Sequence, residues 1–387
     1  MVAVALAGCG SGGADDAVSS DGSTTTSSSL VAESSTAPPA AQEPAIVAAV
    51  EMIDGAERWR VVADQDLDGI TDIATDGAVV VGFNGGCSTT GRRPIVAWDA
   101  ESGAELWRTL DRVPLSGDTS QELIHVGDGL AMMMSDHRLF ALDAATGTER
   151  WSVLGAFGGF DVGGDVVVVA GTESVVALER SDGTERWAVD LATEGPVGDP
   201  VVADDAVLIA GDAALVAVDT ASGEVLWRAA VTAGSDRHRV EWTAGVVVGA
   251  GADGGTVAVD LRDGSELWSR DDVELAQRDN SPGSDHATDG VVMLRAGESR
   301  AVAVDAATGD DLWSDAVDGY WAYPGAVATS RDGGLVARSP RTGDTVWTLP
   351  PDVFDELADQ VDESSGSTSG GTFADDVVLT RFAPCSN

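Results

Sequence analysis

One eleven-residue frame constrains this chain more than any other feature. It places Ala first, Asp, Glu or Ser two positions later, Gly six later and Trp ten later, as in AVDAATGDDLW from Ala303 to Trp313. Eight copies follow one another, with their tryptophans 34 to 48 residues apart. The tryptophans are Trp59, Trp107, Trp151, Trp187, Trp227, Trp268, Trp313 and Trp347. A period near forty residues predicts stacked β units, and a four-stranded propeller blade has this length.

The residue types of the frame predict a β-hairpin. The Ala lies in Val-rich alternating runs such as LVAVD, which are typical of strands. The Asp-to-Gly segment is a turn, because the Asp carboxylate accepts from nearby backbone N–H groups and Gly adopts a positive φ without strain. The small Ala leaves room for the indole to lie across the hairpin and cover the Gly. We therefore expect the eight tryptophans to be core residues of one repeated unit.

This frame resembles the tryptophan-docking motif of pyrroloquinoline-quinone (PQQ) type β-propellers. That superfamily includes quinoprotein alcohol dehydrogenases and the non-enzymatic, BamB-like envelope lipoproteins. The resemblance covers roughly residues 45–387 and implies an all-β propeller, whereas activity does not follow from fold.

The order of the repeats predicts eight blades of four antiparallel strands. Seven whole blades run from Ile70 to Trp347, each expected to have its own small core. The hairpin of residues 45–64 lacks a preceding strand pair, and residues 372–387 lack a following hairpin. Strands from both termini are therefore expected to share one blade and close the ring, which removes exposed sheet edges. The polar stretch 362–371 reads as a flexible insert before that half-blade.

The amino terminus resembles the end of a bacterial lipoprotein signal. Leu6-Ala7-Gly8-Cys9 matches a lipobox, in which Cys9 accepts the lipid. Residues 1–9 lack a basic region, so either the start codon is set too late or the match is accidental. Residues 10–44 are rich in Ser, Thr and Pro and read as a disordered tether. No other apolar run is long enough to span a membrane, so membrane contact is expected through the lipid anchor only.

The charge of the chain excludes some partners. The formal net charge is −43, from 65 acidic and 22 basic residues, and every basic residue is Arg. Such a chain repels nucleic-acid phosphates and anionic lipid headgroups, so no nucleic-acid partner is expected. Solubility or adaptation to high salt also explains this composition.

Two further cysteines follow the second strands of blades expected to be neighbours. Cys87 ends VVVGFNGGC and Cys385 ends VVLTRFAPC. In an exported protein this placement predicts a disulfide that locks the ring. The alternative is two unpaired thiols, since equivalent positions in adjacent blades can lie too far apart.

The stretch DQDLDGITD has the spacing of a calcium loop. Carboxylates of Asp64, Asp66, Asp68 and Asp72 and the carbonyl of Ile70 would supply oxygen ligands to Ca²⁺, with Gly69 allowing the sharp turn. The loop resembles those of EF-hands and integrin-type propeller repeats, although position twelve is Thr75 rather than Glu. The alternative is a solvated acidic connector.

Polar residues also recur on the first strands of the blades, which line the channel of a propeller. The position four residues before the turn is Ile73 in the first blade, and the polar members of this row are His125, Asp161, Glu241 and His286. They are candidates for one polar binding funnel. The alternative is a water-filled channel that tolerates polar side chains, since this spacing is not a metal signature.

These observations favour a non-catalytic, lipid-anchored propeller outside the cytoplasmic membrane that binds envelope or surface proteins. The resemblance also offers a PQQ-dependent dehydrogenase. Its quinone site would require an adjacent Cys-Cys disulfide, a Ca²⁺ ion and a catalytic Asp, and this chain has no adjacent Cys pair, so PQQ is not expected. A structural or sensory ectodomain is the third reading.

Overall fold

The structure is a computed structural model of the 387-residue chain. The described residues are 46–51, 57–62, 72–83, 95–109, 124–135, 138–155, 157–195, 197–212, 214–232, 240–251, 254–275, 286–297, 299–317, 319–323, 325–331, 334–349, 367–374 and 377–384.

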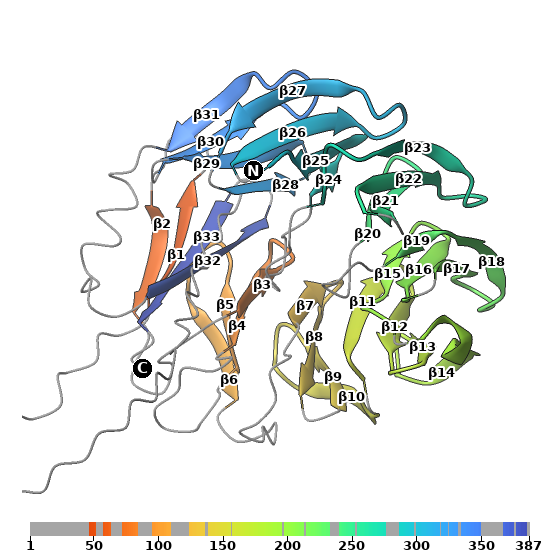
Figure 1. The fold of residues 1–387 in the computed structure, drawn as a ribbon. Helices are drawn as coiled ribbons and strands as arrows, with labels where there is room; N and C mark the ends of the chain where they lie inside the picture. The colour runs from red at the N-terminus through yellow and green to blue at the C-terminus, as the bar shows by residue number, and fades with distance from the viewer. Residues whose placement is uncertain are drawn as a thin grey trace, which may run out of the picture.

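The described strands form eight antiparallel sheets arranged around a ring (Figure 1). Seven sheets have four strands and one has five. Blade 1 contains β3–β6, blades 2 to 7 follow in chain order, and blade 8 combines both ends of the chain. This confirms the predicted all-β, eight-bladed propeller.

The strands fall into four concentric sets. The innermost strands are β3 (Asp72–Thr75), β7 (Ile124–Gly127), β11 (Gly159–Gly163), β15 (Val201–Ala203), β20 (Val240–Thr243), β24 (Ala287–Thr288), β28 (Gly319–Tyr323) and β32 (Ser367–Ala374). The second strands are β4 (Val79–Phe83), β8 (Leu130–Ser135), β12 (Val166–Ala170), β16 (Ala206–Ala210), β21 (Val246–Gly251), β25 (Val291–Arg295), β29 (Ala326–Arg331) and β33 (Val377–Pro384).

The outer half of each blade is the hairpin of the frame. The third strands are β5 (Ile95–Asp99), β9 (Arg138–Asp143), β13 (Ser174–Glu179), β17 (Leu215–Asp219), β22 (Thr256–Asp260), β26 (Arg300–Asp305), β30 (Gly334–Arg338) and β1 (Ile46–Glu51). The outermost strands are β6 (Glu105–Thr109), β10 (Glu149–Leu154), β14 (Glu185–Asp190), β18 (Val225–Ala229), β23 (Glu266–Arg270), β27 (Asp311–Ala316), β31 (Thr345–Leu349) and β2 (Glu57–Val62). The short strand β19 (Val231–Thr232) adds to blade 5, and η1 (Ala192–Glu194) is a single 3-10 turn. Within the described ranges no helix has the length and apolar character to cross a bilayer.

Blade 8 closes the ring with strands from both termini, as predicted. Its order is β2-β1-β33-β32, and Ala49 of β1 lies opposite Leu379 of β33. The inner strand β32 begins at Ser367, so the end of the stretch predicted to be a flexible insert is part of a strand. The sequence did not predict this extension, because residues 367–371 have no apolar alternation. The strand is formed by backbone pairing with β33, which continues as far as the Ser367–Pro384 pair and needs no apolar side chain.

The predicted hairpin of the frame is confirmed in every blade, and the structure adds its register. The Ala that opens the frame lies directly opposite the Trp that ends it, as Ala217 lies opposite Trp227. The same pairing occurs in the other seven hairpins. A bulge follows the Ala each time, because the outer strand carries one extra residue. The acidic residue acts as expected: the Asp219 carboxylate accepts from the backbone N–H and the hydroxyl of Ser222.

The tryptophan docks onto the next blade, which corrects the expectation that it covers the Gly of its own hairpin. The indole N–H of Trp227 donates to the Leu261 carbonyl at 2.8 Å. A methyl group on Gly264, which has φ +70°, would stand 2.7 Å from Trp227 Cε3. The equivalent contacts run from Trp59, Trp107, Trp151, Trp187, Trp268 and Trp313 to the blade that follows each. Gly55, the counterpart for Trp347, lies outside the described residues.

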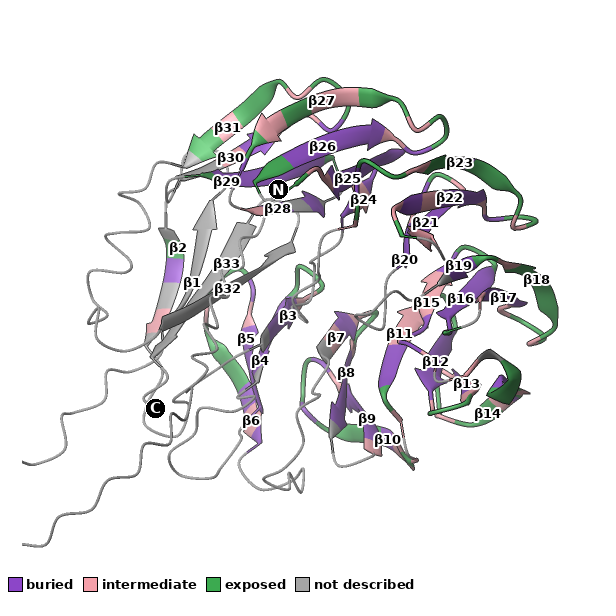
Figure 2. Ribbon diagram, viewed as in Figure 1, coloured by how far each residue is buried: buried purple, intermediate pink, exposed green. Residues whose placement is uncertain are grey.

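The hydrophobic core lies between blades, not within each one as predicted. Each cluster of buried residues joins two successive blades; one cluster combines Val81 and Ile95 of blade 1 with Met133 and Phe140 of blade 2. Figure 2 shows buried residues along the second and third strands and exposed residues along the outermost ones. A single sheet has two faces and cannot bury either alone, so each blade buries its faces against its neighbours.

Candidate functional site

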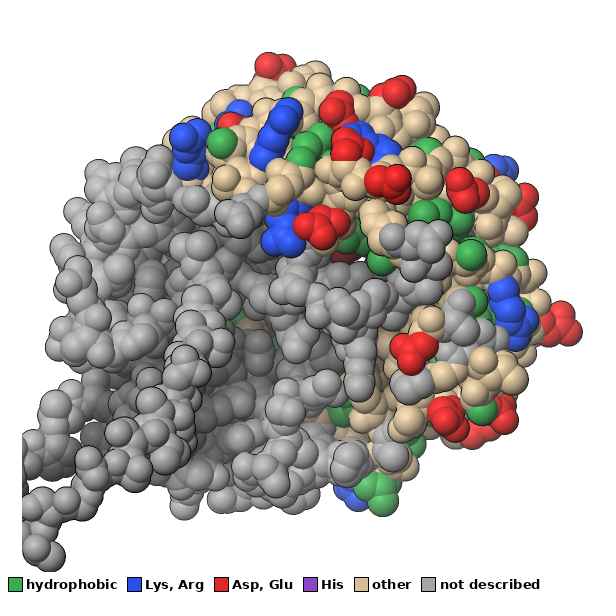
Figure 3. Space-filling view, viewed as in Figure 1, with side chains coloured by type: hydrophobic (Ala, Val, Ile, Leu, Met, Phe, Trp, Pro, Cys, Tyr) green, Lys and Arg blue, Asp and Glu red, His purple; other side chains and the backbone are tan. Residues whose placement is uncertain are grey.

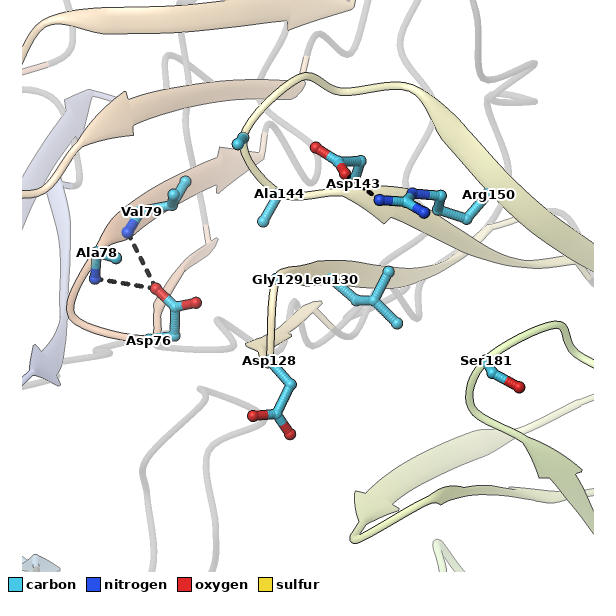
Figure 4. Close-up of a pocket in the computed structure, with 11 residues that line it drawn as sticks. Asp76, Ala78, Val79, Asp128, Gly129, Leu130, Asp143, Ala144, Arg150 and Ser181 are labelled. Atoms are coloured by element: carbon cyan, nitrogen blue, oxygen red, sulfur yellow. Dashed lines mark hydrogen bonds and ion pairs between the residues drawn. The ribbon is translucent and has the colours of Figure 1, made fainter.

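A pocket of about 640 Å³ opens where the turns of blades 1, 2 and 3 meet (Figure 4). Turn β3–β4 contributes Asp76 and Val79, turn β7–β8 contributes Asp128 and Leu130, and blade 3 contributes Ser181. The remaining lining residues are Ala78, Gly129, Asp143, Ala144, Ala145 and Arg150. Three carboxylates therefore surround a pocket whose other walls are largely apolar.

Asp76 is positioned by its own turn. One carboxylate oxygen accepts from the backbone N–H groups of Ala78 and Val79, each at 3.0 Å, as the dashed lines in Figure 4 show. Asp is a frequent turn residue because its side chain caps the backbone in this way. The cap leaves the carboxylate exposed and held beside the pocket.

Asp143 and Arg150 form an ion pair on another side of the pocket, at 2.5 Å. The Asp143 carboxylate also accepts from the hydroxyl and backbone N–H of Thr146. The bond from Arg150, followed by the bond from the Thr146 hydroxyl, holds the pKa of Asp143 below its ordinary value. Asp143 is therefore ionised near neutral pH, and the charge of Arg150 is matched within the protein.

Arg180 joins blades 2 and 3 behind the pocket. Its guanidinium donates to the Asp128 carboxylate at 2.5 Å and to the Gly127 carbonyl at 2.6 Å. His125, half-buried on β7, lies close enough that a methyl group on Gly127 would stand 3.0 Å from its Nε2 atom. Burial first, and then the charge of Arg180, lower the pKa of His125. His125 is therefore a neutral imidazole near pH 7.

This arrangement is suited to binding. Its volume lies within the range of about 300–1,000 Å³ that is usual for ligand sites, and its polar groups are few. In the described part of the chain, no three His, Cys, Asp or Glu side chains gather in a way that could hold a metal ion. On the face seen in Figure 3, acidic and basic side chains interleave over the described rim.

The structure brings together two of the four predicted channel residues. Glu241 of β20 and His286, which precedes β24, meet between blades 5 and 6: the Glu241 carboxylate accepts from the His286 backbone N–H at 3.3 Å and lies 3.4 Å from its Nδ1. The His286 ring packs edge-on against Tyr320 of blade 7, with centroids 5.3 Å apart. Glu241 is 5% exposed and His286 4%, so they link blades and do not line an open channel.

The other two candidates lie at different seams. Asp161 accepts from the Val202 backbone N–H of blade 4 at 2.7 Å, and His125 contributes to the seam near Arg180. The strand pairing also changes the blade 1 member of this row of first-strand positions. Ala74, not Ile73, lies opposite Val81, and Val81 lies opposite Ala97 of the Ala97–Trp107 pair. The turn glycine Gly77 stands at the register position of Asp128, one place earlier than Gly129 in blade 2, and this difference misled the count from the turn.

Several predicted sites lie outside the described residues. They are the lipid acceptor Cys9, the disulfide partners Cys87 and Cys385, and the loop residues Asp64, Asp66, Asp68 and Ile70. Asp72 is described only as the first backbone position of β3. These assignments remain predictions.

The comparisons with known proteins agree with the fold. The family described as outer membrane protein assembly factor BamB matches residues 43–170 and 171–320, which is more than half of the chain. The chain belongs to this family of PQQ-like repeat propellers.

Solved structures resemble this BamB-family chain at low sequence identity. BamB from Moraxella catarrhalis superposes with a TM-score of 0.52 at 16% identity, over 86% of this chain and 91% of that one. The computationally designed Ika8 protein gives 0.56 at 17% identity, over 82% and 95%. The quinohemoprotein alcohol dehydrogenase ADHIIG from Pseudomonas putida HK5 gives 0.52 at 16% identity, over 83% and 75%. Such similarity establishes a shared fold, which serves both catalytic and non-catalytic proteins.

One curated relative is the serine/threonine-protein kinase AfsK of Streptomyces coelicolor. It is 34% identical over 105 residues, which is 27% of this BamB-family chain. The chain spans 12% of the length of that kinase.

Proposed function

We propose that this chain is a non-catalytic binding propeller that acts outside the cytoplasmic membrane on envelope or surface proteins. The observation that carries the proposal is the pocket between blades 1, 2 and 3, where exposed turn residues surround an apolar interior. Membership of the BamB family supports it. The inter-blade contacts leave these turn tips accessible, while the tryptophans and Glu241–His286 hold the ring together.

The proposal includes a lipid anchor and two devices that brace the ring. A lipid on Cys9 would hold the chain at the membrane, and residues 10–44 would separate the propeller from it. A Cys87–Cys385 disulfide and Ca²⁺ bound by the Asp64–Asp72 loop would strengthen the closing seam, because blade 8 contacts blade 1 through β32 and β3.

Photo-crosslinking in intact cells tests the binding role. A photoreactive amino acid at Ser181, which lines the pocket, is expected to trap a discrete envelope or surface protein. The matched control is the same substitution at Asp310, an exposed turn residue of blade 6 whose side chain makes none of the contacts above. Equal adducts from both positions, or none from Ser181, would argue against the pocket as the binding surface.

Two other functions have a specific observation behind them. The similarity to a quinohemoprotein alcohol dehydrogenase makes a PQQ-dependent enzyme the alternative, and a quinone absorbance that co-migrates with protein mixed with PQQ and Ca²⁺ would support it. The match to a serine/threonine-protein kinase makes a sensory ectodomain the other candidate. A small-molecule-dependent rise in Tm without any crosslinked protein would favour sensing.

A further inference from the structure

At one position of the repeated frame, directly after the acidic residue, a side chain can enter the space between two blades. Arg180 directly follows the acidic residue of its frame. Its backbone has the role shared by this position: the carbonyl accepts from Trp151 at 2.9 Å, and the N–H donates to the Asp165 carbonyl at 2.9 Å. The side chain turns back to blade 2 and is 11% exposed. There the guanidinium bonds the Asp128 carboxylate and the Gly127 carbonyl.

Ala144 occupies the same position one blade earlier. Its carbonyl accepts from Trp107 at 2.6 Å and its N–H donates to the Gly129 carbonyl at 2.9 Å, so the backbone is placed as at Arg180. The side chain ends at the methyl group. The Arg180 side chain occupies the space between the turns of blades 2 and 3. The equivalent space between blades 1 and 2, beside Ala144, is called the notch here, and it opens into the pocket of about 640 Å³.

A carboxylate faces this notch from the preceding blade, as it does at Arg180. When turn β3–β4 of blade 1 is aligned with turn β7–β8 of blade 2 through their strand pairs, Asp76 corresponds to Gly127. It therefore stands one residue before the position that Asp128 has in blade 2. The backbone N–H groups of Ala78 and Val79 hold its carboxylate in place. No described cation forms an ion pair with Asp76, and Arg150 in the same pocket is bound by Asp143.

We propose that this pocket binds a guanidinium group on an arginine side chain of a partner polypeptide. The planar guanidinium donates to a carboxylate and a carbonyl at once, as Arg180 does one seam away. At the seam between blades 6 and 7 another guanidinium pairs with a carboxylate, because Arg341 bonds Asp305 at 2.9 Å and lies against Gly290. The fold therefore accommodates guanidinium groups at two seams of this kind.

The size and charge of the pocket favour a polypeptide over a small free cation. The pocket exceeds the volume of one guanidinium, and Val79 and Leu130 offer apolar contact to the stem and flanking residues of an arginine. The net charge of −43 attracts a basic segment from a distance. The inference rests on the proposed binding role and names the chemistry recognised at the same pocket.

Calorimetric titration of the full chain tests this inference at about 0.15 M salt, where exposed charges more than about 8 Å apart are largely screened. The probes are acetyl-Ala-Arg-Ala-amide, its Lys and Glu counterparts, and butylguanidinium. The Arg peptide is expected to bind at one site, the Lys peptide more weakly and the Glu peptide not at all. Butylguanidinium should compete weakly, because it lacks the peptide flanks. If it binds as tightly as the Arg peptide, the polypeptide source is overturned in favour of a small guanidinium ligand.

Three variants locate the site. Asp76→Asn keeps an oxygen for the turn cap and removes the charge, so binding of the Arg peptide should fall about tenfold. Asp310→Asn removes the same charge from a distant exposed turn and should leave binding unchanged. Ala144→Arg should abolish binding by filling the notch with the chain's own guanidinium, at a frame position where Arg180 is already accommodated. Thermal melts verify that each variant is folded.

The outcomes separate this inference from the proposed function. Equal losses in Asp76→Asn and Asp310→Asn, equal binding of the Arg and Glu peptides, or undiminished binding by folded Ala144→Arg would overturn the guanidinium site. A protein crosslinked through Ser181 in that case would leave the binding function standing. Selective binding of the Arg peptide without any crosslinked protein would support the site and contradict the envelope-protein role.

Discussion

The indole nitrogen of Trp227 donates to the Leu261 carbonyl of the following blade at 2.8 Å, so one side chain ties blade 4 to blade 5. Trp227 is 8% exposed, and Ala217 opposite it is fully buried. The bond satisfies a carbonyl at the start of a frame turn, and the ring covers Gly264. Each of the seven hairpins whose docking contact lies within the described residues is therefore also an inter-blade clamp.

Trp227→Ala should lower the free energy of unfolding by about 3–5 kcal/mol, because it removes a large buried aromatic ring. Ala217→Leu should cost about 1–3 kcal/mol, since the added carbons overpack the place where the indole lies. Urea unfolding measures both. Leu226→Ala, on the exposed neighbouring position, is the control and should be near neutral. Near-neutral results for all three would contradict the docking role.

Deletion of residues 372–387 should destabilise the whole propeller. These residues hold the last three of the eight residues of β32 and all of β33. Their loss exposes the edge of β1, takes the partner strand away from the rest of β32, and weakens the contact of β32 with β3. The expected result is a lower Tm for the entire cooperative transition, measured by calorimetry. A truncated chain that melts like the full one would show that blade 8 does not close the ring.

Stability should pass through a maximum as the pH falls. From pH 7 to about 5, protonation of some of the 65 acidic residues relieves repulsion, and Tm should rise. Below about pH 4, Tm should fall. The Ser222 hydroxyl and then its backbone N–H hold the pKa of Asp219 below its ordinary value of 3.8, and bonds from Ser102 lower that of Asp99. A depressed folded-state pKa stabilises above the unfolded value and loses that contribution as the pH drops through the folded one.

Calorimetry across this range in low salt and in 1 M NaCl separates the two effects. Salt should flatten the rise, which arises from exposed charges, more than the fall. Asp219→Asn should lessen the acid loss, since the amide oxygen accepts without ionising. A Tm that increases steadily down to pH 2 would contradict the stabilising role of the frame carboxylates.

The loop Asp64–Asp72 should bind Ca²⁺ and raise Tm. Asp66→Ala/Asp68→Ala removes two of the expected carboxylate ligands and should abolish both the heat of binding and the Tm shift. The control Asp204→Ala removes a carboxylate from a different turn. Indistinguishable heats for wild type and the double variant would leave the loop as an acidic connector.

A Cys87–Cys385 disulfide should form when the chain is exported. Reduction should add the mass of two hydrogens, mapped to the peptides containing these residues, and should lower the free energy of unfolding by about 2–4 kcal/mol. Cys87→Ser/Cys385→Ser should be insensitive to reductant. Complete labelling of both thiols in native, unreduced protein would exclude the bond.

The local sequence by itself determined the hairpin. Ala and Trp ten positions apart define opposite places on two strands, and Asp and Gly between them build the turn, because alternation and turn chemistry act over a few residues. Repetition of the frame then predicted eight blades and the shared closing blade, and the structure confirms both.

Only the tertiary structure decided how the blades meet. Trp227 and Leu261 are 34 residues apart, and Glu241 and His286 are 45 apart, so no local pattern reports that they touch. The sequence contained Ala144 and Arg180 at one frame position, yet their difference became meaningful only when stacking placed Arg180 on Asp128 and left an open pocket at Ala144. Contacts between blades depend on how whole sheets pack face to face, and that packing is a property of the closed ring rather than of any one repeat.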